Sequence, residues 1–433
     1  MNDLRDWSYS ASSRVMAGLA QELSIIPNQH YRPAGYNASR VLSLRLAGIN
    51  PHYLPKVKML QKQLTMWAGL SDEYKIRVGH DAHAVLIEIP KPKRHWTQVT
   101  IEQLQQRHFL RRGAMATLGL GLQDEPKRLV FTDPGIAHVF ITGQTRSGKT
   151  NAERLIGWNL AHNTSPDEAR LIIFDVVKKG SNWNDFGNVA HLAHPLITGL
   201  AEANRVLAWA CQEIERRAVE RYKSPRLFLL VDELKALLDD SAVATGYLSR
   251  IASIGGEFGM HLVLSTQYPQ ISALGSSDLK RNVTTRLCGR VDDAQAAANA
   301  LGVPDSGAET LGGYGDFLLK DIESLTRLTV AHLTPEHVLA LPRAEVQPLD
   351  LPDDDTTNGG SRPVTQPDPL EPEHVALALF EPAGIGKLAK TLGIGKTKAT
   401  RVKQFADSIR QWAIDHGHST CHLVNNDFIQ LNE

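Results

Sequence analysis

A glycine-rich segment carries the clearest chemistry of the chain. Residues 141–150 read ITGQTRSGKT, in which Gly143 and Gly148 are separated by four residues, and Lys149 and Thr150 follow directly. Glycines in this pattern let backbone amides turn toward phosphate oxygens, and a following helix points its positive end at them. Lys149 would reach the β and γ phosphates, while the Thr150 hydroxyl would bind Mg²⁺. The predicted nucleotide-binding residues, for ATP, are Gly143, Gln144, Thr145, Arg146, Ser147, Gly148, Lys149 and Thr150.

Two carboxylates and an amide follow apolar runs further along the chain. The segment RLFLLVDEL brings Asp232 and Glu233 to the end of an expected strand, and MHLVLSTQ ends in Gln267. Asp232 suits the Mg²⁺ shell, through water, and Glu233 suits polarising the attacking water. Gln267 is the candidate sensor of the γ phosphate. The predicted catalytic residues of this site are Lys149, Asp232, Glu233 and Gln267, and the predicted metal-binding residues are Thr150 and Asp232.

These side chains can meet only if the strands that carry them end at one edge of a sheet. The runs AHVFIT, RLIIFD, RLFLLVDE and MHLVLSTQ are short and apolar, and longer helical patterns separate them. Such a pattern predicts an α/β fold with a parallel sheet covered on both faces. We assign the ATPase domain to residues 128–344. A small α+β domain is predicted before it, over 56–127, and residues 1–55 stay unassigned.

Length and composition limit the classes of function. A chain of 433 residues predicts two or three domains. Lys plus Arg equals Asp plus Glu at 47 each, so nucleic acid would be bound by a local patch, not by the net charge. The three cysteines, Cys211, Cys288 and Cys421, form no metal or redox spacing. Neither a signal peptide nor a run of about 18 apolar residues is present, so we expect a soluble cytoplasmic protein.

The carboxyl-terminal part changes character twice. Residues 345–373 are acidic and rich in proline, which predicts a flexible linker. Residues 374–433 follow as a separate domain, in which 384–413 reads as helix, tight turn and helix. Up to Arg410 this hairpin carries seven basic residues and Asp407 as its one acidic residue, which favours contact with DNA over a merely solvated basic surface. The predicted DNA-binding residues are Lys387, Lys390, Lys396, Thr397, Lys398, Arg401 and Lys403.

Several longer segments, taken in order, resemble the FtsK/SpoIIIE group of hexameric double-stranded DNA translocases, within the HerA–FtsK class. They include HVFITGQTRSGKT, the VDEL box, GMHLVLSTQYPQ, and NVTTRLCGRVDDAQAAANALG before LGGYGDFLL. The resemblance covers roughly residues 55–335. It implies a small domain stacked on a RecA-like P-loop ATPase domain, ATP and Mg²⁺ as cofactors, and a homo-hexameric ring around duplex DNA.

The resemblance also implies further residue roles. Arg286, in NVTTRL, matches a family arginine near the neighbouring subunit's nucleotide, where it would stabilise charge on the transferring phosphate. Arg250 is the alternative candidate. Some family members end in a winged helix that reads a DNA sequence, which agrees with the predicted helix-turn-helix domain.

The chain departs from the family pattern in places, and this leaves alternatives open. It has FDVVKKG where an IDPK-like tetrad is usual, and Gly256 where a basic residue is usual. No membrane-spanning region precedes the motor motifs, which favours a soluble relative. An ATP-dependent duplex translocase is the leading hypothesis. An ATP-switched DNA-binding regulator or replication initiator, and a duplex-DNA transfer protein of a plasmid or mobile element, are the alternatives. A single-stranded-DNA coupling protein would usually carry membrane helices and a large all-α insertion.

Overall fold

The computed structural model describes residues 2–23, 39–47, 53–71, 73–80, 84–268, 276–322 and 324–352, together with Lys390, Val402 and Lys403. The chain divides into two compact units, Met1–Asp353 and Asp354–Glu433, and this division falls within the predicted linker. Most of the predicted helix-turn-helix domain lies outside the described residues. Of the predicted DNA-binding residues, Lys390 and Lys403 are described as helical, whereas Lys387, Lys396, Thr397, Lys398 and Arg401 lie outside the described part.

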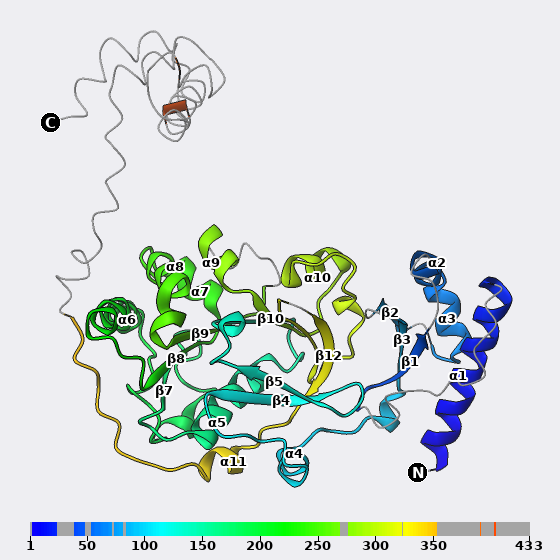
Figure 1. Ribbon diagram of the computed structural model, residues 1–433, viewed down its shortest axis with the longest axis horizontal. Coiled ribbons are helices and arrows are strands. Elements are labelled where there is room, and N and C mark those ends of the chain that lie inside the picture. The colour runs from blue at the N-terminus through cyan, green and yellow to red at the C-terminus, as the bar shows by residue number, and fades with distance from the viewer. Residues whose placement is uncertain are drawn as a thin grey trace. The chain divides into compact units, whose positions relative to one another are not determined.

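The amino-terminal part forms a small α+β domain (Figure 1). Its elements are α1 (Asn2–Leu23), β1 (Val41–Ala47), α2 (Leu54–Met59), α3 (Gln61–Trp67), β2 (Arg77–His80) and β3 (Ala84–Pro90). The strands pair antiparallel in the order β1-β3-β2. Leu19 of α1 and Leu64 of α3 pack with Leu42 and Ile87 of the sheet in one buried cluster. The segment 1–55, unassigned from the sequence, therefore supplies α1 and β1 to this domain.

A nine-stranded sheet forms the second and larger domain, in the order β5-β4-β12-β11-β10-β6-β9-β8-β7. The strands are β4 (Met115–Gly121), β5 (Pro126–Val130), β6 (Val139–Thr142), β7 (Ala169–Phe174), β8 (Arg226–Val231), β9 (Met260–Thr266), β10 (Thr285–Cys288), β11 (Asp316–Lys320) and β12 (Leu325–Val330). From β10 to β7 all neighbours are parallel. The remaining neighbours are antiparallel. The predicted parallel core is thus present, and antiparallel strands extend it on one side.

The boundary between the two domains lies earlier than the predicted end at residue 127. Strands β4 and β5 pair with each other, and β4 pairs with β12, so both belong to the large sheet. Gly119 permits this pairing because a Cβ there would lie 2.0 Å from the Thr329 carbonyl oxygen. Ile101 and Leu104 of α4 (Ile101–Gln106) are also buried in the core of the large sheet. The small domain therefore ends near residue 100.

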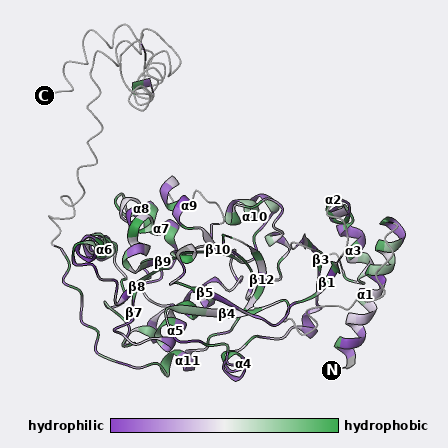
Figure 2. Ribbon diagram, viewed as in Figure 1, coloured by the Kyte–Doolittle hydropathy of each residue, from purple (hydrophilic) through white to green (hydrophobic). Residues whose placement is uncertain are grey.

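Helices cover both faces of the large sheet, as the sequence pattern predicts (Figure 1). They are α5 (Lys149–Asn163), α6 (Leu200–Glu220), α7 (Leu234–Asp240), α8 (Ala244–Ile254), α9 (Ser277–Asn282), α10 (Ala294–Leu301) and α11 (Pro335–Leu339). Neighbouring strand residues point to opposite faces. Ile141 packs in the cluster that contains α5, whereas Phe140 packs in the cluster that contains α6 and α8. Figure 2 shows α6 with both hydrophobic and hydrophilic residues, as expected of a covering helix.

Within the described part of the chain, none of the helices has the length and apolar character needed to cross a membrane.

Candidate nucleotide-binding and hydrolysis site

The loop between β6 and α5 has the backbone conformation that its glycines permit. Gly143 has φ of 151° and Gly148 has φ of 101°, both in the region that favours glycine. A Cβ on Gly148 would lie 2.9 Å from the amide nitrogen of Gly315, so the close approach of two backbones also requires glycine here. Helix α5 begins at Lys149, and Gly148 gives it no side-chain cap. The first amides of α5 are therefore available to a phosphate group.

Backbone hydrogen bonds hold this loop from two sides. On one side, the Gln144 amide donates to the Arg290 carbonyl at 2.9 Å. On the other, the Tyr314 amide donates to the Arg146 carbonyl at 3.0 Å, and the Gly315 amide donates to the Ser147 carbonyl at 2.8 Å. The loops that follow β10 and precede β11 therefore fix the loop in place before any ligand arrives.

Asp232 and Glu233 lie buried at the end of β8, where they are 3% and 7% exposed. One oxygen of Asp232, Oδ2, accepts a hydrogen bond from the Asn182 side chain at 2.7 Å and lies 3.6 Å from Lys178 Nζ. Its other oxygen, Oδ1, accepts a bond from the Ser265 hydroxyl at 3.3 Å. An aspartate with this environment keeps acceptor capacity for a metal-bound water.

Glu233 is positioned by the neighbouring strand β9. It has φ of 60° and precedes α7. Its Oε1 accepts hydrogen bonds from the Thr266 hydroxyl at 2.9 Å and from the Gln267 amide at 3.3 Å. Its Oε2 is buried and has no partner among the described residues. One carboxylate oxygen is thus fixed, and the other is left to accept a proton or a hydrogen bond from water.

Gln267 lies where the sequence predicts it, beside the glycine-rich loop. The Thr145 hydroxyl donates a hydrogen bond to Gln267 Oε1 at 3.2 Å. The structure therefore brings together the loop 143–150, the two carboxylates of β8 and the amide that follows β9. This follows from the parallel register, because β6, β8 and β9 all end at the same edge.

A carboxyl group that sequence reasoning missed lies at the centre of this arrangement. Glu153 of α5 is completely buried, and its Oε2 accepts a hydrogen bond from the Ser265 hydroxyl at 2.7 Å. Burial, and secondly the nearby Asp232, raises the pKa of Glu153 well above its usual value. Burial therefore favours the protonated, neutral form of Glu153 more than it would for an exposed glutamate. The available signal was an acidic residue one turn after Lys149, on a helix with a largely apolar surface.

Lys178 and Asn182 are also missed residues, and they come from the segment that departs from the family pattern. Asp175, buried at the end of β7, accepts hydrogen bonds from the Lys178 amide at 3.1 Å and the Asn182 amide at 3.4 Å. Asp175 thus shapes the turn that directs both side chains toward Asp232.

The donor types present fit a magnesium ion. Mg²⁺ prefers hard oxygen ligands and commonly takes few protein ligands together with substrate phosphates. Thr150, in the first turn of α5, and Asp232 offer a hydroxyl and a carboxylate oxygen. Among the residues that the structure describes, no group of three or more His, Cys, Asp or Glu side chains is placed to hold a metal ion. A metal here would therefore depend on these two residues, water and phosphate.

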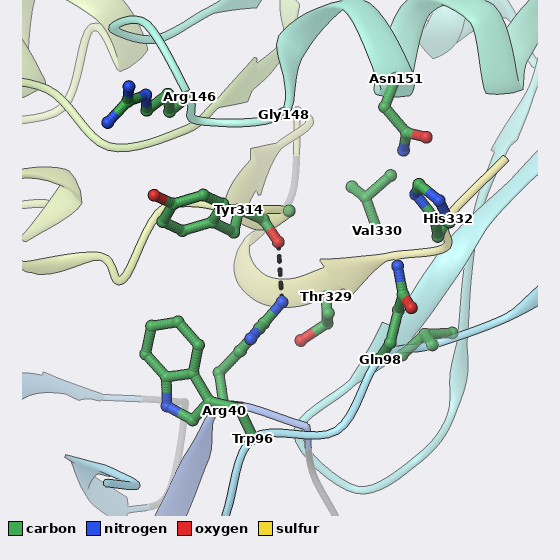
Figure 3. A pocket seen from close by; sticks show the side chains of 12 residues that line it. Arg40, Trp96, Gln98, Arg146, Gly148, Asn151, Tyr314, Thr329, Val330 and His332 are labelled. Atoms are coloured by element: carbon green, nitrogen blue, oxygen red, sulfur yellow. Dashed lines mark hydrogen bonds between the residues drawn. The ribbon is translucent and has the colours of Figure 1, made fainter. Parts of the chain in front are cut away.

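A cavity of about 610 Å³ adjoins the glycine-rich loop on the side of the small domain (Figure 3). Arg146 and Gly148 of the loop, with Tyr314 and Gly315, form part of its wall. Arg40 and Trp96 form another part, and the centre of the Arg40 guanidinium lies 4.4 Å from the Trp96 ring. Arg40 Nη2 donates a hydrogen bond to the Tyr314 carbonyl at 2.8 Å. The cavity is thus continuous with the proposed phosphate site and is closed partly by residues from outside the large sheet.

Comparison with known proteins agrees with this geometry. The FtsK/SpoIIIE family model matches residues 101–224, which include the glycine-rich loop. DNA translocase FtsK of Caldanaerobacter subterraneus subsp. tengcongensis is 27% identical over 362 residues, covering 77% of this chain and 50% of that protein. Residues 101–224 thus form an FtsK/SpoIIIE-type domain. The protein of the same name from Treponema pallidum is 25% identical over 391 residues, covering 81% of this chain and 47% of that protein. This chain spans half or less of the length of these relatives.

The chain shares its fold with solved structures. One is the monomer form of the pCW3 conjugation coupling protein TcpA with ATPγS, with 18% identity, a TM-score of 0.50, and coverage of 76% of this chain and 98% of that chain. Another is the cytoplasmic domain of the Thermomonospora curvata type VII secretion ATPase EccC, with 22% identity and a TM-score of 0.51. The match covers 59% of this chain and 36% of that chain. These likenesses show a shared α/β fold.

The two candidate arginines lie on β10 and α8, outside the glycine-rich loop. Arg286 is on β10, and its Nη2 donates to the Lys280 carbonyl at 3.4 Å. Its Nε is buried without a partner among the described residues, and burial lowers the pKa of the guanidinium. Arg250 is on α8 and pairs with Glu215. The contacts found for each arginine within this chain do not include the glycine-rich loop.

Proposed function

We propose that the chain is an ATP-dependent motor that moves double-stranded DNA. The observation that carries this proposal is the meeting of a complete phosphate loop with Asp232 and Glu233 at one edge of the sheet, in an FtsK/SpoIIIE-type chain. The relatives named DNA translocase FtsK supply the substrate class, which we extend to this chain.

The residues divide the work of hydrolysis as follows. The loop amides of 143–150 and the Lys149 ammonium bind the phosphates, and Thr150 with Asp232 would hold Mg²⁺, which neutralises phosphate charge when bound. Glu233, fixed through Oε1 by Thr266, orients and polarises the attacking water with its free Oε2. Gln267, hydrogen-bonded to Thr145, senses whether the γ phosphate is present.

We infer that the motor works as a ring of identical subunits, a hexamer, in which Arg286 reaches the nucleotide of a neighbour. The buried Arg286 Nε, unpartnered within the described chain, agrees with an arginine whose final partner belongs to another molecule. Arg250 is already paired with Glu215 and is the weaker candidate. The basic tail would contact duplex through Lys387, Lys390, Lys396, Thr397, Lys398, Arg401 and Lys403. A cytoplasmic location stays a prediction.

The test is steady-state ATP hydrolysis with and without linear duplex DNA, with Glu233→Gln as the blank. We expect duplex of any sequence to stimulate turnover strongly, and the variant to lose at least a hundredfold in kcat. Single-stranded DNA of equal length is the matched control and should stimulate weakly. Slow turnover that duplex leaves unchanged would contradict a motor and support the alternative in which ATP acts as a switch.

A further inference from the structure

The cavity beside the glycine-rich loop has one wall that the large sheet does not supply. Arg40 directly precedes β1 of the small domain, and Trp96 follows β3 in the segment that leaves it. Trp96 is anchored through its ring nitrogen, which donates to the Lys91 carbonyl at 2.7 Å. Figure 3 shows Arg40 and Trp96 side by side on this wall, with Asn151 and His332 across the cavity. The small domain therefore contributes fixed side chains to a space that begins at Gly148.

Arg40 keeps hydrogen-bonding capacity in this position. One of its terminal nitrogens is bound to the Tyr314 carbonyl, but its Nε is buried and lacks a partner within the described residues. A buried guanidinium nitrogen without an acceptor is unfavourable, because it has lost water and gained nothing in return. Burial lowers the pKa of Arg40, which Asp316 partly opposes. The side chain as a whole is only partly buried and lines the cavity, so the accessible part of its guanidinium can meet a ligand there.

Two further lining residues, Asn151 and Tyr314, differ from Arg40 in what they can offer a ligand. The side chain of Asn151 is already engaged, since its amide donates to the Ala331 carbonyl at 2.8 Å and its oxygen accepts from the Leu333 amide at 2.9 Å. Tyr314 has 58% of its surface exposed and presents an aromatic side chain beside Arg40. A stacked guanidinium, an aromatic ring and a volume of about 610 Å³ suit a planar ring with polar edges.

We propose that Arg40 and Trp96 bind the nucleoside half of the nucleotide, so that the small domain completes the nucleotide site of its own subunit. This rests on the proposed ATP site, because the phosphates must lie on the loop for the nucleoside to enter the cavity. Arg40 would contact the base or ribose through the accessible part of its guanidinium. Trp96 holds the guanidinium in that orientation by stacking.

A consequence for the motor follows from the same contacts. Arg40 bonds the carbonyl of Tyr314, and the amide of Tyr314 bonds the Arg146 carbonyl in the glycine-rich loop. A nucleoside that binds Arg40 therefore tightens the link between the small domain and the loop, and its departure loosens that link. Loss of nucleotide would thus weaken the contact between the two domains.

The test measures binding without DNA, by isothermal titration calorimetry of the full chain. Mg-ADP probes both halves of the site, and inorganic pyrophosphate with Mg²⁺ probes the phosphate half alone. For Arg40→Ala we expect ADP affinity about tenfold weaker and pyrophosphate affinity within about twofold of wild type. Trp96→Ala should show the same pattern. Arg94→Ala is the matched control, since Arg94 is in the same segment, is well exposed and does not line the cavity.

Each outcome has a distinct meaning. Selective loss of ADP affinity supports the proposal. Equal loss of ADP and pyrophosphate affinity overturns it, because Arg40 would then act only by holding the loop. Unchanged ADP affinity in both variants, or wild-type affinity equal for ADP and pyrophosphate, also overturns it while leaving the phosphate site intact. If wild type binds neither ligand, the proposed ATP site itself fails.

Discussion

Arg327 of β12 and Glu88 of β3 form an ion pair between the two domains, with Nη1 and Oε2 2.7 Å apart and both side chains almost completely buried. Arg327 also binds Asp316 through two hydrogen bonds of 2.9 and 2.6 Å. Glu88 also pairs with Arg77 of β2, which is buried too. The pKa of Arg327 is raised by Asp316 and Glu88 despite its burial. Two arginines and two carboxylates thus form one closed network at the junction of the domains.

Removing one member of this network should lower the free energy of unfolding. Glu88→Ala would leave Arg77 and Arg327 buried with too few acceptors, and breaking a buried pair in this way costs about 3–5 kcal/mol. We expect the free energy of unfolding in urea to fall by about that amount. Glu220→Ala on α6, which removes one side of an exposed pair with Arg216, is the control and should change it by less than about 0.5 kcal/mol. Equal effects of the two variants would rule out a stabilising network.

The hydroxyl that fixes Glu233 should affect turnover more than binding. Thr266→Val keeps the shape of the side chain but removes the donor to Glu233 Oε1. We expect kcat for ATP to fall about tenfold with KM within about twofold, because a misplaced water-activating group weakens the transition state more than the bound substrate. Thr132→Val, at an exposed position away from the loop, should leave both constants unchanged. A rise in KM without a fall in kcat would show that Thr266 serves binding instead.

The raised pKa of Glu153 predicts a stability effect with a definite sign. Because its pKa is raised in the folded protein, its favourable contribution is present below about pH 4.5 and is lost as pH rises toward the folded value. Glu153→Gln cannot ionise, so it should be about as stable as wild type in mild acid and more stable than wild type at neutral and alkaline pH. Urea denaturation without nucleotide across this range measures the difference. A variant that is less stable at high pH would mean that Glu153 is ionised and needed as an anion.

Two buried histidines predict the response to acid. Burial lowers the pKa of His138 to about 4 and of His261 to about 3. Because these pKa values are lowered, the stabilising contribution of each neutral histidine is full above about pH 6.5 and is lost as pH falls toward 4 and 3. The loss is about 3 kcal/mol for His138 and about 5 kcal/mol for His261.

His138→Asn tests this, because its oxygen can still accept from the Leu262 amide, which bonds His138 Nδ1 at 3.0 Å. At pH 8 the free energy of unfolding of His138→Asn should be lower than that of wild type. Between pH 6.5 and 4 it should fall by less than that of wild type. His108→Asn, at an exposed position with φ of 53° that asparagine tolerates, should follow the wild-type profile. Parallel profiles for wild type and His138→Asn would contradict a neutral buried histidine.

The phosphate loop and the ends of β8 and β9 could be predicted from the sequence because their signals are local. Gly143 to Thr150 are contiguous, Asp232 and Glu233 follow directly on an apolar run, and Gln267 lies at the end of the segment MHLVLSTQ. The parallel register then brings them together without further information. The role of the segment FDVVKKG could not be predicted in the same way. Lys178 reaches Asp232 only because Asp175 accepts a hydrogen bond from the Lys178 amide and so shapes the turn between them.

The remaining features depend on contacts that no local pattern carries. Arg40 and Tyr314 are 274 residues apart in the chain, and their hydrogen bond exists only because the small domain folds against the large sheet. From the sequence, β4 and β5 are assigned to the small domain. Only the pairing of β4 with β12, and of β5 with β4, shows that they belong to the large sheet. The segment 1–55 lacks a clean period, yet α1 fits against α3 closely, with Gly18 directly under the Trp67 ring.

The pairing of β4 with β12 also determines how the protein can be shortened. A fragment that starts at residue 131 would retain every residue of the phosphate loop and both carboxylates of β8. It would nevertheless leave β12 as an open edge, with the backbone groups of Leu328 to Val330 facing no partner strand. Such an edge invites pairing with another chain, so this fragment should self-associate and precipitate at concentrations where a fragment starting at residue 101 stays monodisperse. Strands β4 and β5 therefore protect the large domain against aggregation.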